Sequence, residues 1–203
     1  MKKVFISLLS IAMVLLCLCS CGKKEETPAP AENTNSTSGI HHVEINVKDY
    51  GTIKLELDGD TAPITVENFI KLANDGFYDG LTFHRIKNGY MIQGGDPDHN
   101  GTGGSDEQIK GEFIQNGVQN NISHTRGTIS MARALYSMDS ASSQFFICQA
   151  DSTFLDGQYA GFGHVTEGME IVDKIASDAK PTDNNGTIPF EEQPVIESVK
   201  VID

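Results

Sequence analysis

Short runs in which apolar and polar residues alternate dominate the chain from residue 40 onward, and glycines and other turn residues separate them. Alternation with a period of two is typical of a strand that buries one face. The runs 43–47 and 53–57 follow this pattern on either side of Asp49, Tyr50 and Gly51, which predicts an antiparallel hairpin. Further strand-like runs lie at residues 81–86, 90–93, 127–131, 144–149, 161–165 and 195–202.

Two segments have helical spacing instead. The first begins near Thr61, whose hydroxyl is expected to cap the helix, has Pro63 at its start, and ends at Gly76, which suits a left-handed cap. The second covers residues 169–176. Eight strand-like runs and two helices predict one mainly β domain over residues 40–203. The pattern alone leaves an antiparallel barrel and a sandwich as alternatives.

The first twenty residues differ in character from the rest of the chain. Lys2 and Lys3 precede the apolar stretch 4–19, which is typical of a secretory signal and somewhat short for a membrane-spanning helix. The segment 18–22 resembles a lipobox, in which Cys21 would receive the lipid after cleavage. We therefore expect residues 1–20 to be a lipoprotein signal peptide. An uncleaved anchor and a soluble secreted form are the alternatives.

Residues 21–39 are expected to form the lipidated N-terminus and a disordered tether, because the segment has almost no apolar side chains to bury. Lipidated Cys21 would attach the domain to the cell membrane on its extracytoplasmic face. That face is the outer surface, or the periplasmic side where there are two membranes.

Composition narrows the partners and the chemistry. With 15 Lys and Arg against 28 Asp and Glu, the formal net charge is −13, which argues against a nucleic-acid partner. Cys148 alone lies outside the N-terminal segment, so no internal disulfide is expected, and the six histidines fit no zinc-binding spacing. We expect no metal and no cofactor. Nothing indicates a stable oligomer, so we expect a monomer.

Five segments, in order along the chain, carry a resemblance to a known family. They are Phe83-His84-Arg85-Ile86 with Gly89-Tyr90-Met91-Ile92-Gln93-Gly94-Gly95-Asp96, then Asn100-Gly101-Thr102-Gly103-Gly104, Gly127-Thr128-Ile129-Ser130-Met131-Ala132, Ser143-Gln144-Phe145-Phe146-Ile147 and Leu155-Asp156-Gly157. Together they resemble the cyclophilins. The resemblance implies a closed eight-stranded antiparallel β-barrel capped by two α-helices. It also implies peptidyl-prolyl cis-trans isomerase activity on proline-containing unfolded or extended polypeptides.

Isomerisation needs no nucleophile, metal or proton donor. Rotating an X-Pro bond breaks amide resonance, and the site must bind the twisted bond better than either planar form. A fixed cation directed at the proline nitrogen would achieve this, and the resemblance assigns that role to Arg85. Gln93 would orient Arg85 and bind a backbone group of the substrate. These two residues are the predicted catalytic residues.

The resemblance also implies the substrate-binding residues. They are His84, Tyr90, Met91, Ala132, Arg133, Phe145, Phe146, Phe154, Leu155 and Tyr159. Arg133 stands where many members have asparagine, and we expect little effect because the contact there is through the main chain. Phe154 and Tyr159 replace a tryptophan and a histidine, which implies weak cyclosporin sensitivity. The alternative is a peptide-binding chaperone or adhesin without useful turnover, although the presence of Arg85 and Gln93 favours the isomerase.

Overall fold

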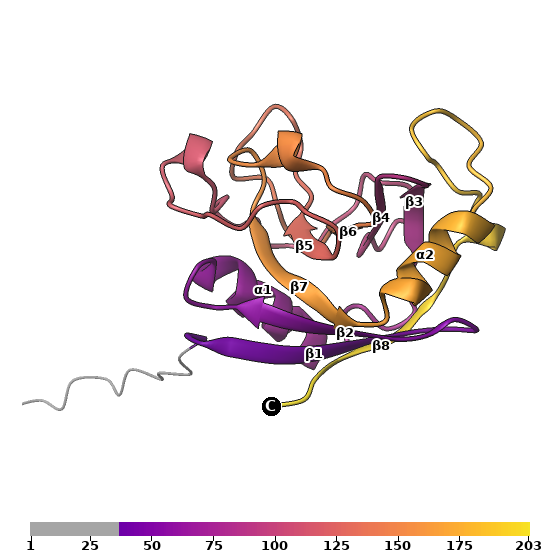
Figure 1. Ribbon diagram of the computed structural model, residues 1–203, viewed down its shortest axis with the longest axis horizontal. Coiled ribbons are helices and arrows are strands. Elements are labelled where there is room, and N and C mark those ends of the chain that lie inside the picture. Colours follow the sequence, from indigo (N-terminus) through magenta and orange to yellow (C-terminus); the bar gives the residue numbers. More distant parts are fainter. Residues whose placement is uncertain (1–36) are drawn as a thin grey trace, which may run out of the picture. The chain divides into compact units, whose positions relative to one another are not determined.

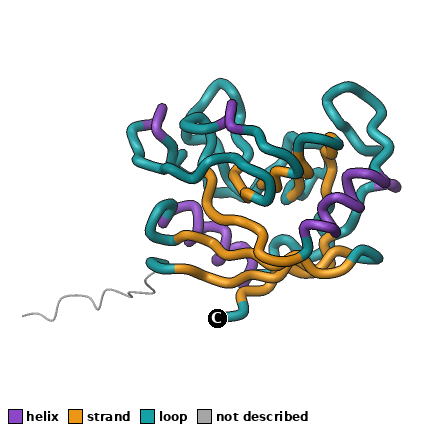
Figure 2. The backbone as a smooth tube through the Cα atoms, in the orientation of Figure 1, coloured by secondary structure: helices purple, strands orange, loops and turns teal. Residues whose placement is uncertain are grey.

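The computed structural model describes residues 37–203. Its strands and helices follow the predicted order along the chain (Figure 1). They are β1 (Ile40–Val47), β2 (Gly51–Asp58), α1 (Pro63–Asn74), β3 (Phe83–Lys87), β4 (Met91–Gly94), β5 (Thr128–Met131), β6 (Phe145–Cys148), β7 (Gly161–Glu167), α2 (Met169–Asp178) and β8 (Ile196–Val201). Long loops connect the strands from β4 to β7 (Figure 2). Two of these loops contain the 3-10 helices η1 (Ile114–Asn116) and η2 (Thr153–Leu155).

All eight strands of the described residues form one antiparallel sheet, in the order β3-β4-β6-β5-β7-β2-β1-β8. The predicted hairpin is confirmed, since Val43 lies opposite Leu55 and Ile45 opposite Ile53. These apolar residues share one face, so the hairpin buries that face and exposes the other. The domain is therefore mainly β, as the alternation predicted.

The expectation of a closed barrel is wrong, because the sheet is open. Its edge strands β3 and β8 have no ladder between them. Beside this seam the chain forms an isolated bridge between Thr82 and Val195, and the Ile196 amide donates to the Leu81 carbonyl at 2.8 Å. Pro194 accepts a hydrogen bond there but has no N–H to donate, so it cannot continue a ladder. The result is a curled half-barrel with two helices.

The main core lies inside the curl of the sheet, and aromatic side chains form its centre. Phe69 of α1 packs against Tyr78, Phe145 and Phe162, with ring centroids 5.0, 5.5 and 5.3 Å away. Each such aromatic pair contributes about 0.5–1.5 kcal/mol beyond the area that it buries. These contacts attach α1 to the concave side of the sheet.

The predicted cap of α1 is wrong. The Thr61 hydroxyl donates to the Asp58 carboxylate at 2.6 Å and makes no cap bond to the helix. Glu112 instead accepts the first-turn amides of Ile64 and Thr65, at 3.1 and 2.8 Å. The helix therefore depends on a residue far along the chain.

The described segment begins and ends at the same edge of the domain. The His41 ring Nδ1 lies 2.9 Å from Asp203 Oδ2, and the His42 amide donates to Asp203 Oδ1 at 2.6 Å. Within residues 37–203, neither helix has the length and apolar character that crossing a bilayer requires. Cys21, the predicted signal peptide 1–20 and most of the predicted tether 21–39 lie outside the described residues.

Candidate active site

A cleft of about 300 Å³ lies beside β3, β4 and β6. Its lining comes from segments that the sheet brings together from distant parts of the sequence. The lining residues are His84, Arg85, Tyr90, Met91, Gln93, Asn100, Gly101, Ala132, Arg133, Phe146, Leu155, Tyr159, Asn185 and Thr187. Most of the predicted site residues are therefore neighbours in space.

The apolar wall of the cleft is a small cluster separate from the main core. Met91, Phe146, Cys148 and Leu155 form this cluster, and each side chain is buried. Its origin is the alternation of side chains along β6, which places Phe146 and Cys148 opposite the core-facing residues. Met91, Phe146 and Leu155 of this cluster line the cleft and give it an apolar side.

Two of the predicted substrate-binding residues do not line this cleft. Phe145 is fully buried in the main core, because alternation along β6 gives it the face opposite to Phe146. Phe154 lies outside the cleft with 65% of its surface exposed, and its ring packs on Tyr90 at a centroid distance of 5.7 Å. Phe154 therefore supports the rim through Tyr90.

A bulge in β3 directs Arg85 toward the cleft. The pairing of β3 with β4 shifts between Phe83, opposite Gly94, and Arg85, opposite Gln93. This irregularity allows Phe83 and Ile86 both to face the core while Arg85 lines the cleft. Bulges commonly redirect a side chain beside an active site.

Three side chains form a hydrogen-bonded chain that starts at Arg85. Arg85 Nη1 donates to Gln93 Oε1 at 2.9 Å, and Gln93 Nε2 donates to Gln144 Oε1 at 2.9 Å. Gln144 Nε2 then donates to the Gly103 carbonyl at 2.7 Å. Each amide is fixed in one orientation, so the oxygen of Gln93 must face the guanidinium. Gln93 therefore lies within hydrogen-bonding distance of Arg85, and its orienting role stays a prediction.

His84 is a buried imidazole in the wall of the cleft. Burial lowers the pKa of His84 to about 4, against a smaller raising effect of Asp96, so the ring is neutral near pH 7. Neither ring nitrogen has a hydrogen-bond partner among residues 37–203. Both nitrogens are also buried, so they are not open to a ligand in this conformation.

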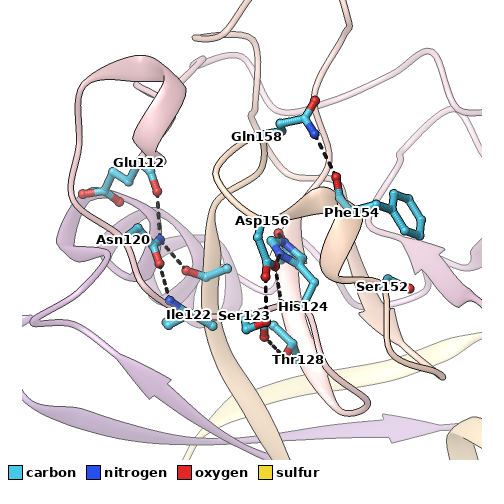
Figure 3. A network of polar contacts seen from close by, with 12 residues as sticks. Glu112, Asn120, Ile122, Ser123, His124, Thr128, Ser152, Phe154, Asp156 and Gln158 are labelled. Carbon is cyan, nitrogen blue, oxygen red and sulfur yellow. Dashed lines mark hydrogen bonds and ion pairs between the residues drawn. The ribbon is translucent and has the colours of Figure 1, made fainter.

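Behind the apolar wall, Ser130, His124 and Asp156 are linked in the manner of a Ser-His-Asp triad, with Ser130 and His124 buried and Asp156 exposed. His124 Nδ1 is 2.9 Å from Asp156 Oδ1, and His124 Nε2 is 3.0 Å from Ser130 Oγ (Figure 3 shows the contact with Asp156). Ser130 is fully buried, so a substrate has no access to its hydroxyl. The His124 ring stacks on Phe146 at 6.0 Å and 18°. The group therefore supports the wall of the cleft.

Two further findings limit the chemistry of this region. Burial raises the pKa of the Cys148 thiol to about 12, so the thiolate that a nucleophile requires is scarce near pH 7. In the described part of the chain, no three His, Cys, Asp or Glu side chains are grouped so that they could hold a metal ion.

A second cavity of about 270 Å³ borders the first and shares Gln93, Gly101, Ala132 and Arg133 with it. Gly101, Gly103 and Gly104 line it. Tyr136, 90% exposed, stands at its rim.

Sequence reasoning missed several residues of the cleft. Gln144, which lines the second cavity, was recognised only as part of a motif, although it continues the hydrogen-bonded chain from Arg85. Asn185 and Thr187 come from a turn that follows α2, and no sequence signal connected them with β3.

Comparisons with known proteins all lead to one family. The family described as cyclophilin type peptidyl-prolyl cis-trans isomerase/CLD matches residues 42–201. Peptidyl-prolyl cis-trans isomerase A of Dickeya dadantii is 43% identical over 165 residues, which cover 75% of this chain and 80% of that protein. Peptidyl-prolyl cis-trans isomerase B of Bacillus subtilis is 44% identical over 131 residues, which cover 64% of this chain and 87% of that protein.

A solved structure shares the fold. It is a Cryptosporidium parvum cyclophilin type peptidyl-prolyl cis-trans isomerase crystallised in the presence of the dipeptide Ala-Pro. The two structures match with a TM-score of 0.70 at 28% sequence identity, over 80% of this chain and 99% of the other.

Proposed function

Since this chain belongs to the cyclophilin type peptidyl-prolyl cis-trans isomerases, we propose that it assists the folding of proline-containing polypeptides outside the cytoplasm. The reaction is rotation about X-Pro bonds. The observation that carries the proposal is the orientation of Arg85 by Gln93 beside an apolar wall.

The uncatalysed barrier to rotation is about 18–20 kcal/mol, because the planar amide is stabilised by resonance. A hundred-thousandfold acceleration requires removal of about 7 kcal/mol from that barrier. Only contacts that are stronger in the twisted state than in either planar state can remove it. The site must therefore act on a feature that the twisted bond alone possesses.

That feature is the lone pair that the proline nitrogen regains when the amide twists. The guanidinium of Arg85 presents several donors in a rigid plane. Its Nε donates to the Asn185 carbonyl at 2.8 Å and its Nη1 to Gln93, while Nη2 has no hydrogen bond to any residue of the described segment. Nη2 is the donor that we assign to the proline nitrogen.

The proline ring would lie against Met91, Phe146 and Leu155, with Tyr90 and Tyr159 beside them. The Ala132 amide already donates to the Gln144 carbonyl at 2.9 Å, so the substrate backbone would be held through the Ala132 carbonyl and main-chain groups of Arg133. His84 borders this site, with both ring nitrogens buried. The substrates are proline-containing segments of unfolded or extended polypeptides.

The test is the rate of cis-trans exchange of an Ala-Pro peptide with the full chain and its Arg85→Ala variant. We expect the variant to lose tenfold or more in kcat, since tenfold corresponds to about 1.4 kcal/mol of the barrier. The control is Arg126→Ala, which removes an exposed arginine paired with Asp173 and should leave the rate unchanged. A parent chain that binds the peptide but does not accelerate exchange would favour the binding-only chaperone instead.

The place of action is the second part of the proposal. The apolar stretch after Lys2 and Lys3, together with the lipobox-like segment, supports secretion and lipid attachment at Cys21. The lipid would hold a monomeric domain at the extracytoplasmic face of the membrane. The polar segment that follows Cys21 would give the domain room to turn toward its substrates.

Cell fractionation tests this part independently of the enzyme activity. We expect the parent chain in the membrane fraction, with a diacylglyceryl group on Cys21 in the mass spectrum of its N-terminal peptide. Cys21→Ser should lose the lipid modification, while the matched Cys19→Ser should keep it. Retention of residues 1–20 on an unmodified chain would show an uncleaved anchor instead.

A further inference from the structure

The turn after α2 is organised by one carboxylate. Asp183 Oδ1 accepts the amides of Asn185, Gly186 and Thr187 at 2.9, 2.9 and 3.1 Å, and Oδ2 accepts the Thr187 hydroxyl at 2.9 Å. These bonds hold the pKa of the Asp183 carboxyl below its usual value, and the bond from the Thr187 amide has the largest effect. One exposed side chain thus fixes three successive backbone groups.

The turn is attached to the outer edge of β3. Thr187 forms a bridge with Arg85, the Ile86 amide donates to the Gly186 carbonyl at 2.8 Å, and the Ile188 amide donates to the His84 carbonyl at 3.0 Å. Gly186 has a φ of +95°, and a Cβ there would lie 2.6 Å from the Ile86 carbonyl oxygen. Glycine is therefore required for this close approach.

The same turn supplies an acceptor to the guanidinium. The Asn185 carbonyl accepts Arg85 Nε at 2.8 Å, while Gln93 accepts Nη1 at 2.9 Å. When two different nitrogens of a rigid guanidinium each donate to a fixed acceptor, both the position and the plane of the group are fixed. Without the Asn185 carbonyl, only the bond from Nη1 to Gln93 and the 4.0 Å contact of Nη1 with Met91 Sδ would hold the guanidinium.

We propose that Asp183 is a positioning residue for the isomerase reaction. Its carboxylate folds residues 183–187 so that the Asn185 carbonyl holds Arg85 in the orientation that the twisted amide requires. This inference rests on the proposed role of Arg85.

The chain contains a matched control. Asp58 Oδ1 accepts the amides of Asp60 and Thr61 at 3.1 and 2.9 Å, and Asp58 Oδ2 accepts the Thr61 hydroxyl at 2.6 Å. The motif is nearly the same as at Asp183, but Asp58 does not line the cleft. A merely structural role would make the two residues equivalent.

The experiment compares Asp183→Ala, Asp183→Asn and Asp58→Ala in the full chain. Three quantities are measured: kcat and KM for an Ala-Pro peptide, the melting temperature, and the ¹H–¹⁵N resonance of Arg85 Nε, assigned by its loss in Arg85→Lys. For Asp183→Ala we expect a tenfold lower kcat, a KM within twofold of the parent, and a shifted or broadened Arg85 resonance. A misplaced catalytic group weakens the twisted state more than ground-state binding.

Asp183→Asn keeps the oxygen that accepts the three amides, so it should recover at least half of the parent kcat. Asp58→Ala should lower the melting temperature while kcat and the Arg85 resonance stay unchanged. Wild-type kcat in Asp183→Ala, or equal losses of kcat in Asp183→Ala and Asp58→Ala, would overturn the positioning role. A parent chain that does not accelerate exchange would overturn the proposed function instead, so the two failures are distinguishable.

Discussion

Arg133, which stands where many cyclophilins have asparagine, makes several contacts through its side chain. Its guanidinium lies over the rings of Tyr159 and Phe113, at 4.9 and 5.3 Å from their centroids. Nε donates to the Gln158 carbonyl at 3.0 Å, and Nη1 donates to the Ala134 carbonyl at 3.1 Å. The side chain therefore ties the loop after β5 to one wall of the cleft. From the sequence we expected little effect of this arginine, because only the main-chain contact at its position was considered.

Replacing Arg133 with asparagine should release this wall. Loss of the cation–π contacts and of the hydrogen bonds is expected to lower the free energy of unfolding by about 1–3 kcal/mol. KM for an Ala-Pro peptide should rise several-fold with a smaller change in kcat, because Arg133 does not contact the reacting bond. Urea unfolding and exchange kinetics measure these effects. Arg133→Lys retains the charge but not the planar guanidinium. Parent-like stability and KM in Arg133→Asn, together with losses in Arg133→Lys, would contradict the role of Arg133 in holding this wall.

For single residues, the alternation of side chains along a strand explains which of them could be assigned to the cleft from the sequence. Phe146 lines the cleft and Phe145 does not, which the period of two along β6 could have decided. The contribution of Asn185 could not be foreseen, because its carbonyl reaches Arg85 across a separation of 100 residues. The bulge at His84 is equally hidden, since it depends on the register between β3 and β4.

At the scale of the element, α1 shows how a helix can depend on a distant side chain. Both oxygens of Glu112 contact its first turn, and Oε2 also accepts the Thr65 hydroxyl at 2.7 Å. Glu112 is only 2% exposed and Thr65 is fully buried, so the Thr65 amide and hydroxyl have no access to water as a substitute. A carboxylate at this end of a helix is also favoured by the helix dipole. Thr61 had the right residue type for a cap, but Asp58 competed for its hydroxyl.

Glu112→Ala should therefore destabilise the domain by about 2–4 kcal/mol, because it leaves buried donors without acceptors. Glu112→Gln keeps one acceptor oxygen and should cost less. Thermal and urea unfolding measure the difference. Glu107→Ala is the control, since Glu107 forms an exposed pair with Lys71 at 3.4 Å and should change stability by less than about 1 kcal/mol. Equal effects of the two alanine variants would exclude the capping role.

At the scale of the whole molecule, acid acts on two groups of residues in succession. His84 and His124 are buried, and burial lowers the pKa of both. Hydrogen bonds hold the pKa of the Asp173 and Asp183 carboxyls below the usual value. For both groups the folded state binds fewer protons than the unfolded state, so acid favours unfolding. The histidines respond first, because their unfolded pKa is higher.

The melting temperature should be constant above about pH 6.5 and fall as the pH decreases toward 4. For His84, whose pKa is lowered from 6.5 to about 4, the stability lost is on the order of 3 kcal/mol. The carboxylates add a second loss below about pH 4. Thermal melts between pH 7.5 and 4.5 measure the first window.

His84→Asn does not titrate in this range, so its melting temperature should vary less with pH. His164→Asn is the control, because the His164 side chain is 60% exposed. If His84→Asn and the parent lost stability with the same slope, His84 would not be the group responsible.

The contacts of Asp203 with His41 and His42 have a practical consequence for engineering. They bring β1 and Asp203 to one edge of the part of the chain that the structure describes. A domain whose ends lie close together can be inserted into a surface loop of another protein without separating the two ends of that loop. The segment from residue 40 to residue 203 is thus suited to insertion as a unit into another protein, with a short linker at each junction.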